Sequence, residues 1–338
     1  MYNGVEEVKR MDTELSLCPK GRKLELWKSF LSRAGLEADT DVERTVLVWD
    51  DEQLIATGSR RGNLLKCIAV DELRQGEGLT ATVLTVLRQD AFNAGHSHLF
   101  LYTKPKNKWM FSSLFFYPVA QTEDVLLMEN RRDGIKAFLQ NLPAESASGK
   151  VGAAVMNCNP FTKGHRYLIE TAAKECDRLY VFVLSEDRSA FSAADRLEMV
   201  RLGTADLPNV TVLPTGPYLI SSATFPTYFL KEREKASTIQ CRLDIEIFTK
   251  YYVPKFGIQT RFVGTEPLSQ MTNQYNEALR KYLPEAGIEL RVIQRLEQEG
   301  IPVSASAVRE RMAAGDREAL RQLVPQTTWD YLNQHNYL

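Results

Sequence analysis

Long apolar runs, a strong net charge and paired cysteines are all missing from this 338-residue chain. No run of roughly 18 apolar residues occurs, and the first ten residues contain no apolar signal core, so we expect neither a membrane span nor export. The formal net charge is −1, which excludes a global field that would recruit nucleic acid or an acidic membrane. Any phosphate ligand must therefore be held by a local site.

Metal-binding and disulfide patterns are absent as well. Five cysteines occur, at positions 18, 67, 158, 176 and 241, and no two of them form a CxxC pair. We therefore expect reduced thiols in a cytoplasmic protein. His96 and His98 point the same way from a predicted strand, but no third ligand lies nearby, so we predict no metal site held by the protein.

The length predicts two domains of about 150 residues each. The stretch "NLPAESASGK", residues 141–150, is rich in small, polar and turn-forming residues and separates two regions with clear patterns. We interpret it as a linker between a domain of residues 1–143 and a domain of residues 150–338.

The first half has the pattern of an α+β domain. "RTVLVWDDEQLIATGSRRGNLLKCIAVD" alternates β-rich runs with turns, which predicts antiparallel strands. "GLTATVLTVLRQDAFNAG" has apolar residues at helical spacing, and "SHLFLYTK" is a further strand. The predicted order is three strands, a helix, a strand, a helix and a strand.

The second half alternates short apolar strands with helices, which predicts a Rossmann-like parallel sheet buried on both faces. Ligands bind such sheets at the carboxyl ends of the strands. The strands are "KVGAAVMN", "RLYVFVLS", "NVTVLP", "TRFVG" and "ELRVIQR", and the helices are "GHRYLIETAAKECD", "SAADRLEMVRLGTAD" and the long stretch "PTYFLKEREKASTIQCRLDIEIFTKYY".

The turn "NPFTKGH" joins the first of these strands to its helix and holds Thr162, Gly164 and His165. Backbone N–H groups at a helix start have no partner within the helix and attract phosphate. Gly164 lets a ligand approach the backbone closely, and His165 can donate a hydrogen bond to a phosphate oxygen. An ordinary turn whose histidine caps its own helix explains the tetrapeptide equally well.

A second stretch, "VSASAVRERM", favours the phosphate interpretation. It puts Ser304 and Ser306 ahead of a helix whose first turn has Arg309. Two hydroxyls, free N–H groups and a guanidinium suit the β and γ phosphates of a triphosphate. A plain Ser-capped helix is the alternative, but two such signals within one α/β unit favour a nucleotide site.

Together the two stretches resemble the HxGH superfamily of nucleotidyltransferases in its TxGH form, here Thr162 to His165. "VSASAVR" is similar to the ISxSxxR element of that superfamily, with Val303 in place of isoleucine. The resemblance implies catalysis by positioning, without a protein nucleophile. Donors stabilise charge on the α-phosphate, and Mg²⁺ binds the leaving pyrophosphate.

A second resemblance concerns the first half. Gln75, Gly76 and Gly78 precede a helix and look like the loop with which GCN5-related acyltransferases hold the pyrophosphate of coenzyme A, with Leu73 at its usual Gln or Arg position. "MFSSLFF" resembles the closing element of that family, with Phe111 in place of the tyrosine often used as general acid. We therefore expect a CoA-shaped binder rather than an amine acetyltransferase.

The whole chain resembles the citrate lyase ligase family through "NCNPFTKGHRYLI", "SSATFPTYF", "RFVGTEP" and "VSASAVR" in this order. The resemblance implies an acid–thiol ligase that uses ATP and Mg²⁺. Such an enzyme activates acetate as acetyl-adenylate and acetylates the thiol of a CoA-derived prosthetic group on the citrate lyase acyl carrier subunit, releasing AMP and pyrophosphate. No nucleic acid or membrane partner is implied.

The same resemblance assigns roles to individual residues. Three alternatives stay open, in which Lys163 is a solvated turn residue, Arg196 is a surface helix residue and "SSATFPTYF" is a loop packed on the core. The catalytic residues are Thr162, Lys163 and His165; those that bind ATP are Asn157, Asn159, Phe161, Gly164, Arg196, Gly264, Glu266, Ser304, Ser306 and Arg309; those that bind the CoA-like arm are Gln75, Gly76 and Gly78; and those of the acid pocket are Ser221, Ser222 and Thr224.

Two other functions are compatible with these residues. One is transfer of the adenylyl group to phosphopantetheine, for which a single TxGH domain suffices. The other is a regulatory protein that binds a nucleotide and a CoA-like ligand without turnover.

Overall fold

The computed structural model describes residues 11–144, 149–186, 189–219, 225–230, 236–265, 270–298 and 301–338. It divides into two compact units, one formed by Met1–Gly134 with Pro226–Ala236 and the other by Ile135–Phe225 with Ser237–Leu338. The sequence analysis put a single boundary between residues 143 and 150. It gave no signal that the segment Pro226–Ala236 belongs with the first unit.

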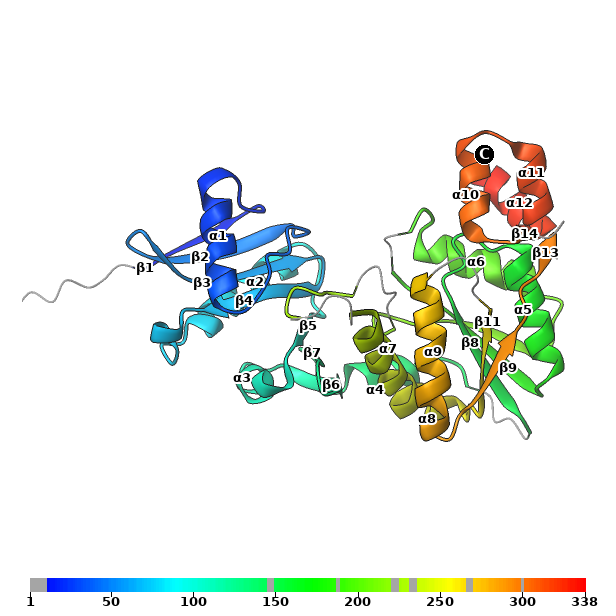
Figure 1. Ribbon diagram of the computed structural model, residues 1–338, viewed down its shortest axis with the longest axis horizontal. Helices are drawn as coiled ribbons and strands as arrows, with labels where there is room; N and C mark the ends of the chain where they lie inside the picture. The colour runs from blue at the N-terminus through cyan, green and yellow to red at the C-terminus, as the bar shows by residue number, and fades with distance from the viewer. Residues whose placement is uncertain are drawn as a thin grey trace, which may run out of the picture. The chain divides into compact units, whose positions relative to one another are not determined.

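The first unit is built on a mixed sheet (Figure 1). Within the described residues this sheet has seven strands in the order β1-β2-β3-β4-β5-β7-β6, and all neighbours are antiparallel except β4 and β5. Short 3₁₀ turns occur at Glu72–Arg74 and Pro105–Asn107. The elements are β1 (Met11–Ser16), α1 (Gly21–Arg33), β2 (Arg44–Asp50), β3 (Gln53–Arg61), β4 (Leu64–Val70), α2 (Leu79–Asn93), β5 (Phe100–Thr103), α3 (Lys108–Ser113), β6 (Tyr117–Gln121) and β7 (Leu126–Glu129).

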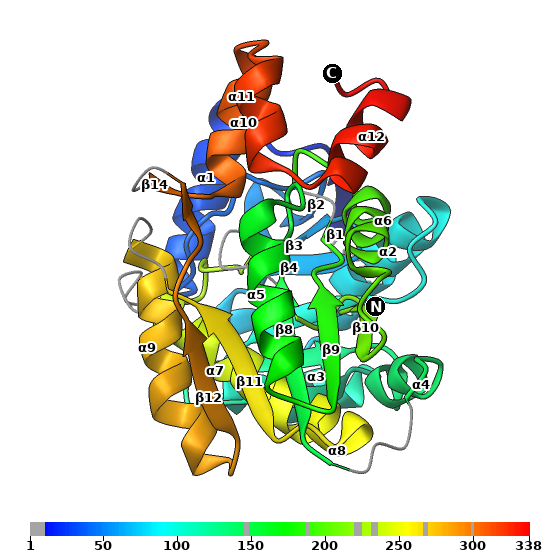
Figure 2. The same cartoon turned by 90° about the vertical axis from the view of Figure 1, so that its right-hand side faces the viewer.

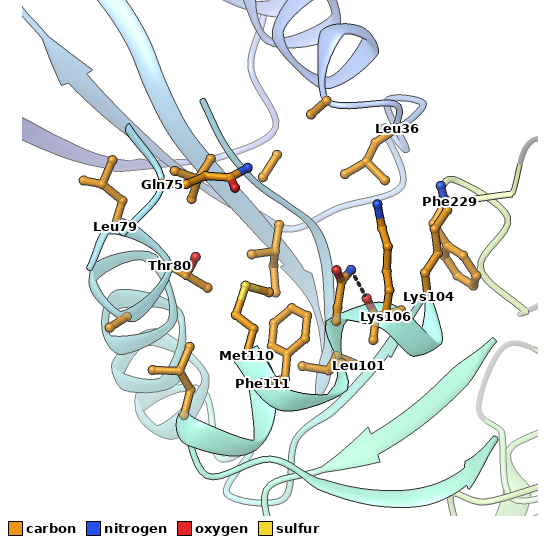
Figure 3. Close-up of a pocket in the computed structure, with 18 of the residues that line it drawn as sticks. Leu36, Gln75, Leu79, Thr80, Leu101, Lys104, Lys106, Met110, Phe111 and Phe229 are labelled. Carbon is orange, nitrogen blue, oxygen red and sulfur yellow. Dashed lines mark hydrogen bonds between the residues drawn. The ribbon is translucent and has the colours of Figure 1, made fainter. Parts of the chain in front are cut away.

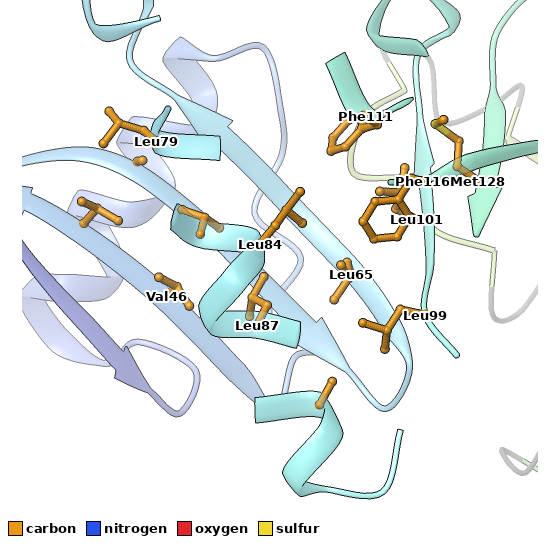
Figure 4. Packing of buried hydrophobic residues seen from close by; sticks show 14 of the residues in the cluster. Val46, Leu65, Leu79, Leu84, Leu87, Leu99, Leu101, Phe111, Phe116 and Met128 are labelled. Carbon is orange, nitrogen blue, oxygen red and sulfur yellow. The ribbon is translucent and has the colours of Figure 1, made fainter. Parts of the chain in front are cut away.

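Helix α2 supplies much of the apolar core of this unit. Its Leu84 and Leu87 point toward the strands that hold Val46 and Leu65 (Figure 4), and all four side chains are buried. Helix α1 buries Trp27, whose indole N–H donates to Thr57 Oγ1 of β3 at 3.0 Å. The sheet is therefore fixed by apolar helix contacts that leave its strand ends free for binding.

Strands β4 and β5 separate along their length. They pair only through Leu64 with Phe100 and Leu65 with Leu101, although β4 continues to Val70. Beyond Leu65 the backbone groups of the two strands no longer bond to each other. A cavity opens where they part.

The second unit contains a fully parallel sheet (Figure 2). In the described part of the chain it has five strands, in the order β10-β9-β8-β11-β12. The elements are α4 (Gly134–Gln140), β8 (Val151–Met156), α5 (Lys163–Lys174), β9 (Arg178–Val183), α6 (Ala193–Thr204), β10 (Val210–Pro214), α7 (Ala236–Ile247), a π turn (Phe248–Tyr252), α8 (Val253–Phe256), β11 (Thr260–Gly264), α9 (Gln270–Glu285), β12 (Glu289–Ile293), the pair β13 (Glu297–Gln298) and β14 (Ile301–Pro302), α10 (Ala305–Ala313), α11 (Arg317–Leu323) and α12 (Gln326–Gln334).

Both faces of this sheet are covered, as an almost wholly apolar strand requires. Helix α5 lies across β8 and β9 on one face (Figure 2), where Val181 packs into the core beneath it. On the other face the Phe182 ring meets the rings of Tyr252 and Phe256 edge-on, at centroid distances of 5.3 and 5.2 Å. The site forms between these two layers of helices, at the ends of the strands.

The predicted fold class, an α+β unit followed by a parallel-sheet unit, is confirmed. One prediction of secondary structure is wrong in part. In the stretch of residues 226–252, the described residues 226–230 are not helical and α7 begins only at Ala236. Pro226 disfavours a helical conformation of the residue before it. Tyr228 and Phe229 lie in a turn closed by the Leu230 N–H donating to the Thr227 carbonyl oxygen at 3.0 Å, and this segment belongs to the first unit. Among the helices that the structure describes, none combines the length and apolar character that a membrane crossing needs.

Candidate active site and arm pocket

The turn after β8 is closed by a reciprocal cap. Thr162 precedes α5, and its Oγ1 accepts a hydrogen bond from the His165 backbone N–H at 3.3 Å. In return His165 Nδ1 accepts from the Thr162 backbone N–H at 3.0 Å. The histidine thus occupies the position in which Glu or Gln usually completes a capping box. This cap fixes the imidazole at the carboxyl end of β8.

The hydrogen bonds also define the protonation state of His165. Because Nδ1 is an acceptor, the neutral ring has its proton on Nε2, the nitrogen that the cap leaves free to donate. Burial and, to a smaller extent, the nearby positive charge of Arg295 lower the pKa of His165 to about 4. Near neutral pH the ring is therefore an uncharged donor, suited to binding an anionic oxygen without taking up a proton.

Two segments distant in sequence meet at this turn. A Cβ on Gly164 would lie 2.8 Å from the Val303 carbonyl oxygen, so only glycine permits this approach. Arg309 Nη1 donates to the Asn159 carbonyl oxygen at 2.6 Å, and its Nη2 donates to Ser306 Oγ at 3.2 Å. Ser304 caps α10 by accepting from the Ala307 N–H at 3.1 Å. The starts of α5 and α10 therefore lie next to one another, and each has free N–H groups.

A cavity of about 660 Å³ lies at this edge of the sheet. Two arginines, Arg261 and Arg295, are part of its wall, and none of its described lining residues is Asp or Glu. Such a wall favours a polyanion. The lining includes seven of the predicted residues, which are Asn157, Thr162, Gly164, His165, Gly264, Ser304 and Ser306.

Other predicted residues of this unit support the turn from behind. Phe161 is buried, with its ring parallel to the His165 imidazole at a centroid distance of 6.0 Å. Asn159 Oδ1 accepts from the Phe191 N–H at 3.2 Å. Lys163 is partly exposed at the first position of α5 and is not among the residues of the cavity wall.

Arg196 is fully buried, which rules out the alternative that it is a surface helix residue. Its Nη1 donates to the Asn157 carbonyl oxygen at 3.0 Å, to Asn157 Oδ1 at 2.6 Å and to the Leu184 carbonyl oxygen at 2.8 Å. These bonds tie together the ends of β8 and β9. In the described structure Arg196 positions Asn157, which lines the cavity, and does not line it itself.

Four predicted residues lie outside the described residues: Glu266, Ser221, Ser222 and Thr224. Several residues of the wall were not predicted from the sequence. Arg295 lies two residues after the end of β12, and Arg261 interrupts the apolar strand "TRFVG"; a charge at either place in a buried sheet was the available signal. Asn276, whose Nδ2 donates to the Gly264 carbonyl oxygen at 3.0 Å, gave no such signal.

The first unit has its own cavity of about 670 Å³, at the place where β4 and β5 part. Figure 3 shows Gln75, Lys106, Met110 and Phe111 arranged around it. Tyr228 and Phe229 of the segment Pro226–Ala236 form part of the same wall. The predicted Gln75, Gly76 and Gly78 are thus all brought to this pocket.

The start of α2 faces this pocket without a side-chain cap. Gly78 precedes α2 with φ +78°, and Gly76 has φ +92°, conformations that other residues rarely adopt. The free N–H groups of the first turn therefore remain available to an anion. Arg74 does not contribute a free charge, because it pairs with Asp50 at 2.6 Å and Glu77 at 2.7 Å.

Phe111, Tyr228 and His98 of the first unit each contact other side chains or the backbone of that unit. Phe111 is buried against Phe116, at a centroid distance of 6.4 Å, and offers no proton donor. Tyr228 donates from its hydroxyl to the Tyr102 carbonyl oxygen at 3.1 Å, and its own carbonyl oxygen accepts from the Glu37 N–H at 2.7 Å. His98 Nε2 lies 2.6 Å from Glu129 Oε2, and no cluster of three metal-ligand side chains occurs within the described ranges.

The fold thus has two units with a pocket each, a mixed-sheet unit and a parallel-sheet unit whose pocket lies at its strand ends. A sequence profile of the citrate lyase ligase C-terminal domain matches residues 151–332. The chain is 41% identical to citrate (pro-3S)-lyase ligase of Escherichia coli K12 over 320 residues, which cover 93% of this chain and 91% of that protein. It is 42% identical to the ligase of the same name from Klebsiella pneumoniae over 311 residues, 90% and 91% of the two chains. The chain therefore belongs to the citrate lyase ligase family, whose members are acid–thiol ligases.

Solved structures resemble the two units only in part. Thermotoga maritima TmcAL, solved with alpha-thio ATP, is 16% identical, with 55% of this chain and 56% of that chain covered and a TM-score of 0.35. Escherichia coli ElaA is 11% identical, with 36% of this chain and 100% of that chain covered and a TM-score of 0.32. Resemblances this distant carry no argument about the reaction.

Proposed function

We propose that this chain activates acetate with ATP and transfers the acetyl group to a thiol on the citrate lyase acyl carrier subunit. Family membership supports the ligase class and the carrier. The observation that carries the proposal for ATP is the meeting of the α5 and α10 starts around a cavity with two arginines and no described carboxylate. Such a site suits a triphosphate.

In the first step an acetate oxygen attacks the α-phosphorus of ATP. The bond between the α-phosphorus and the bridging oxygen of pyrophosphate breaks, and acetyl-adenylate and pyrophosphate form. Developing charge on the α-phosphate needs fixed donors, which we assign to His165 Nε2–H and the free N–H groups of α5. Thr162 holds that imidazole in place, and Lys163 adds positive charge at the same helix start.

We assign the β and γ phosphates to Ser304, Ser306 and the start of α10, with Arg309 holding Ser306 and the Asn159 turn together. Gly164 and Gly264 leave room for the nucleotide, and Phe161 and Arg196 support the turn from below. We assign the ribose or adenine to Glu266. Mg²⁺ bound to ATP would neutralise charge on the leaving pyrophosphate.

In the second step the thiolate attacks the acetyl carbon, the bond to AMP breaks, and a thioester forms. The first-unit pocket has the split sheet and the uncapped α2 start that suit the diphosphate of a CoA-derived arm. We assign this contact to Gln75, Gly76 and Gly78. In this division of labour residues 1–143 hold the arm and residues 150–338 form the adenylate, in a cytoplasmic enzyme that needs neither nucleic acid nor a membrane.

The test combines the full chain with ATP, Mg²⁺, acetate and the deacetylated carrier, and follows the mass of the carrier. We expect an acetyl gain that requires both ATP and acetate. A carrier of unchanged mass, together with adenylylated phosphopantetheine in a parallel reaction, would establish the adenylyltransferase alternative. Binding of ATP without any turnover would establish a regulatory protein.

A further inference from the structure

One buried cation in the second unit lacks a hydrogen-bonding partner. Arg261 is only 2% exposed, and its Nε has no hydrogen-bond partner among the described residues. A guanidinium stays charged at all pH values that proteins experience. Burying such a charge without a direct partner costs several kcal/mol. An anion that reached Arg261 would offset part of this cost.

The neighbours of Arg261 do not satisfy it. Its guanidinium lies over the Phe248 ring, 4.3 Å from the centroid. This stacking leaves the N–H groups in the plane of the guanidinium without an acceptor among the described residues. Asp244 attracts it electrostatically, yet no ion pair within 4 Å joins Arg261 to a carboxylate in the described structure. Tyr275 instead donates to Asp244 Oδ2 at 2.5 Å. The Asp244 carboxylate is thus held by another side chain.

Arg261 lines the same cavity as His165 but belongs to a different part of it. On β11 the side chains of neighbouring residues alternate between faces. Phe262 packs into the core on the α5 side, whereas Arg261 faces Phe248 of the π turn. The helix starts that suit the triphosphate lie at α5 and α10. Arg261 therefore lies apart from the helix starts that suit the triphosphate.

We propose that Arg261 binds the carboxylate of the acid that is activated. This inference rests on the proposed function, in which the two anions that share the cavity are ATP and acetate. Arginine suits the task because its planar fork matches the two oxygens of a carboxylate. The contact orients the acid beside the α-phosphate and strips it of water, so it governs the affinity for acetate more than the affinity for ATP.

The informative variant is Arg261→Met, since replacing a buried charge by an apolar side chain of similar length is often neutral for folding. In acetate-dependent exchange of labelled pyrophosphate into ATP, we expect the KM for acetate to rise about 10–10²-fold, the loss associated with hydrogen bonds to a charged group. The KM for ATP should change by less than about threefold. Arg261→Lys keeps the charge but not the planar guanidinium, so its KM for acetate should lie between the values of the wild type and of Arg261→Met.

Arg178→Met is the matched control. It removes a half-buried arginine of the same unit, which lies at the start of β9 and is not among the described residues of the cavity wall. Its two KM values should stay near those of the wild type. An equal rise of both KM values in Arg261→Met would assign Arg261 to the phosphates of ATP, and an unchanged KM for acetate would overturn the proposal.

A direct binding measurement keeps this inference separate from the proposed function. Saturation-transfer NMR on the full chain with α,β-methylene-ATP should show the acetate methyl signal in the wild type. Arg261→Met should lose that signal and keep the signals of the nucleotide, which also shows that the variant is folded. No acetate signal in the wild type would refute the acid site, whereas an acetate signal without any exchange would refute the proposed reaction and leave the site standing.

Discussion

Replacing His165 by asparagine or by glutamine separates the two tasks that the structure gives this residue. Nδ1 accepts the Thr162 N–H and closes the helix cap, while Nε2–H is free to donate. Asparagine puts an amide oxygen near the position of Nδ1 and has nothing at Nε2. Glutamine puts an amide N–H near the position of Nε2 and leaves Thr162 without its acceptor.

The magnitudes of the two losses differ. Removing one preorganised donor to a charged transition state lowers the rate by about 10²–10³-fold, so His165→Asn should exchange pyrophosphate that much more slowly while it remains stable. Thr162 is 1% exposed, so in His165→Gln its N–H becomes a buried donor without a partner, which costs about 1–3 kcal/mol of unfolding free energy. The glutamine variant should therefore be less stable but faster than the asparagine variant.

The assay is acetate-dependent exchange of labelled pyrophosphate into ATP without carrier, run beside urea unfolding of each variant. Thr162→Ala is the control for the cap, because it lowers stability by about 1 kcal/mol and leaves Nε2–H in place. Near-normal exchange by a folded His165→Asn would refute the reasoning and reduce His165 to a cap.

The pH dependence of His165 follows from the same contacts. Since burial lowers its pKa to about 4, the folded state favours the neutral ring. The stability that this preference supplies is complete above the unfolded pKa of about 6.5 and is lost as the pH falls through about 4. We expect the imidazole resonance that disappears in His165→Asn to stay constant from about pH 8 to pH 5.5. Titration of that resonance near pH 6.5 would contradict a buried imidazole that stays neutral down to about pH 5.5.

Three further outcomes are expected. Gly164→Ala should raise the KM for ATP about tenfold or more, because its Cβ would lie 2.8 Å from the Val303 carbonyl oxygen. Gly264→Ala, whose Cβ would meet a leucine methyl at 3.2 Å, should change this KM much less. Equal KM values for ATP in the two variants would argue against the close approach of Gly164 to Val303. Gly78→Ala, forced to φ +78° at the start of α2, should lower carrier acetylation and leave pyrophosphate exchange intact, and parallel loss of both would make the first unit purely structural. Amines should not be acetylated from acetyl-CoA, because Phe111 has no proton to give, and rapid formation of an acetylated amine would restore the acyltransferase alternative.

The sequence predicted the parts of the site that depend on local chemistry. Strand-to-helix turns carry their own signals, and so Thr162, His165 and Ser304 were found at helix starts, where the structure has them. The meeting of Gly164 with Val303 depends on the path of the chain between them, which no short motif encodes. Arg261 differs, because a charge within an apolar strand is a local signal, and it was overlooked.

Predictions failed where tertiary packing overrides local preference. Residues 226–252 have a composition compatible with one long helix, yet the described residues from Pro226 to Leu230 pack on the first unit. Tyr228 gains hydrogen bonds to Tyr102 and Glu37 there, and burial of its ring adds to them. The alternative of a surface position for Arg196 fails for a similar reason, because carbonyl oxygens at two strand ends bind a cation that the sequence places on a helix.

The route of the segment Pro226–Ala236 makes the two units inseparable by a single cut. A protease that nicked the chain between residues 143 and 150 would leave the amino-terminal fragment without Tyr228, so the Tyr102 carbonyl and the Glu37 N–H would lose their partners. The other fragment would expose Phe229 and Leu230, which are otherwise buried. The cleaved pieces should therefore stay together as a reconstituted complex, and genes for the two halves should express well only when they are made together.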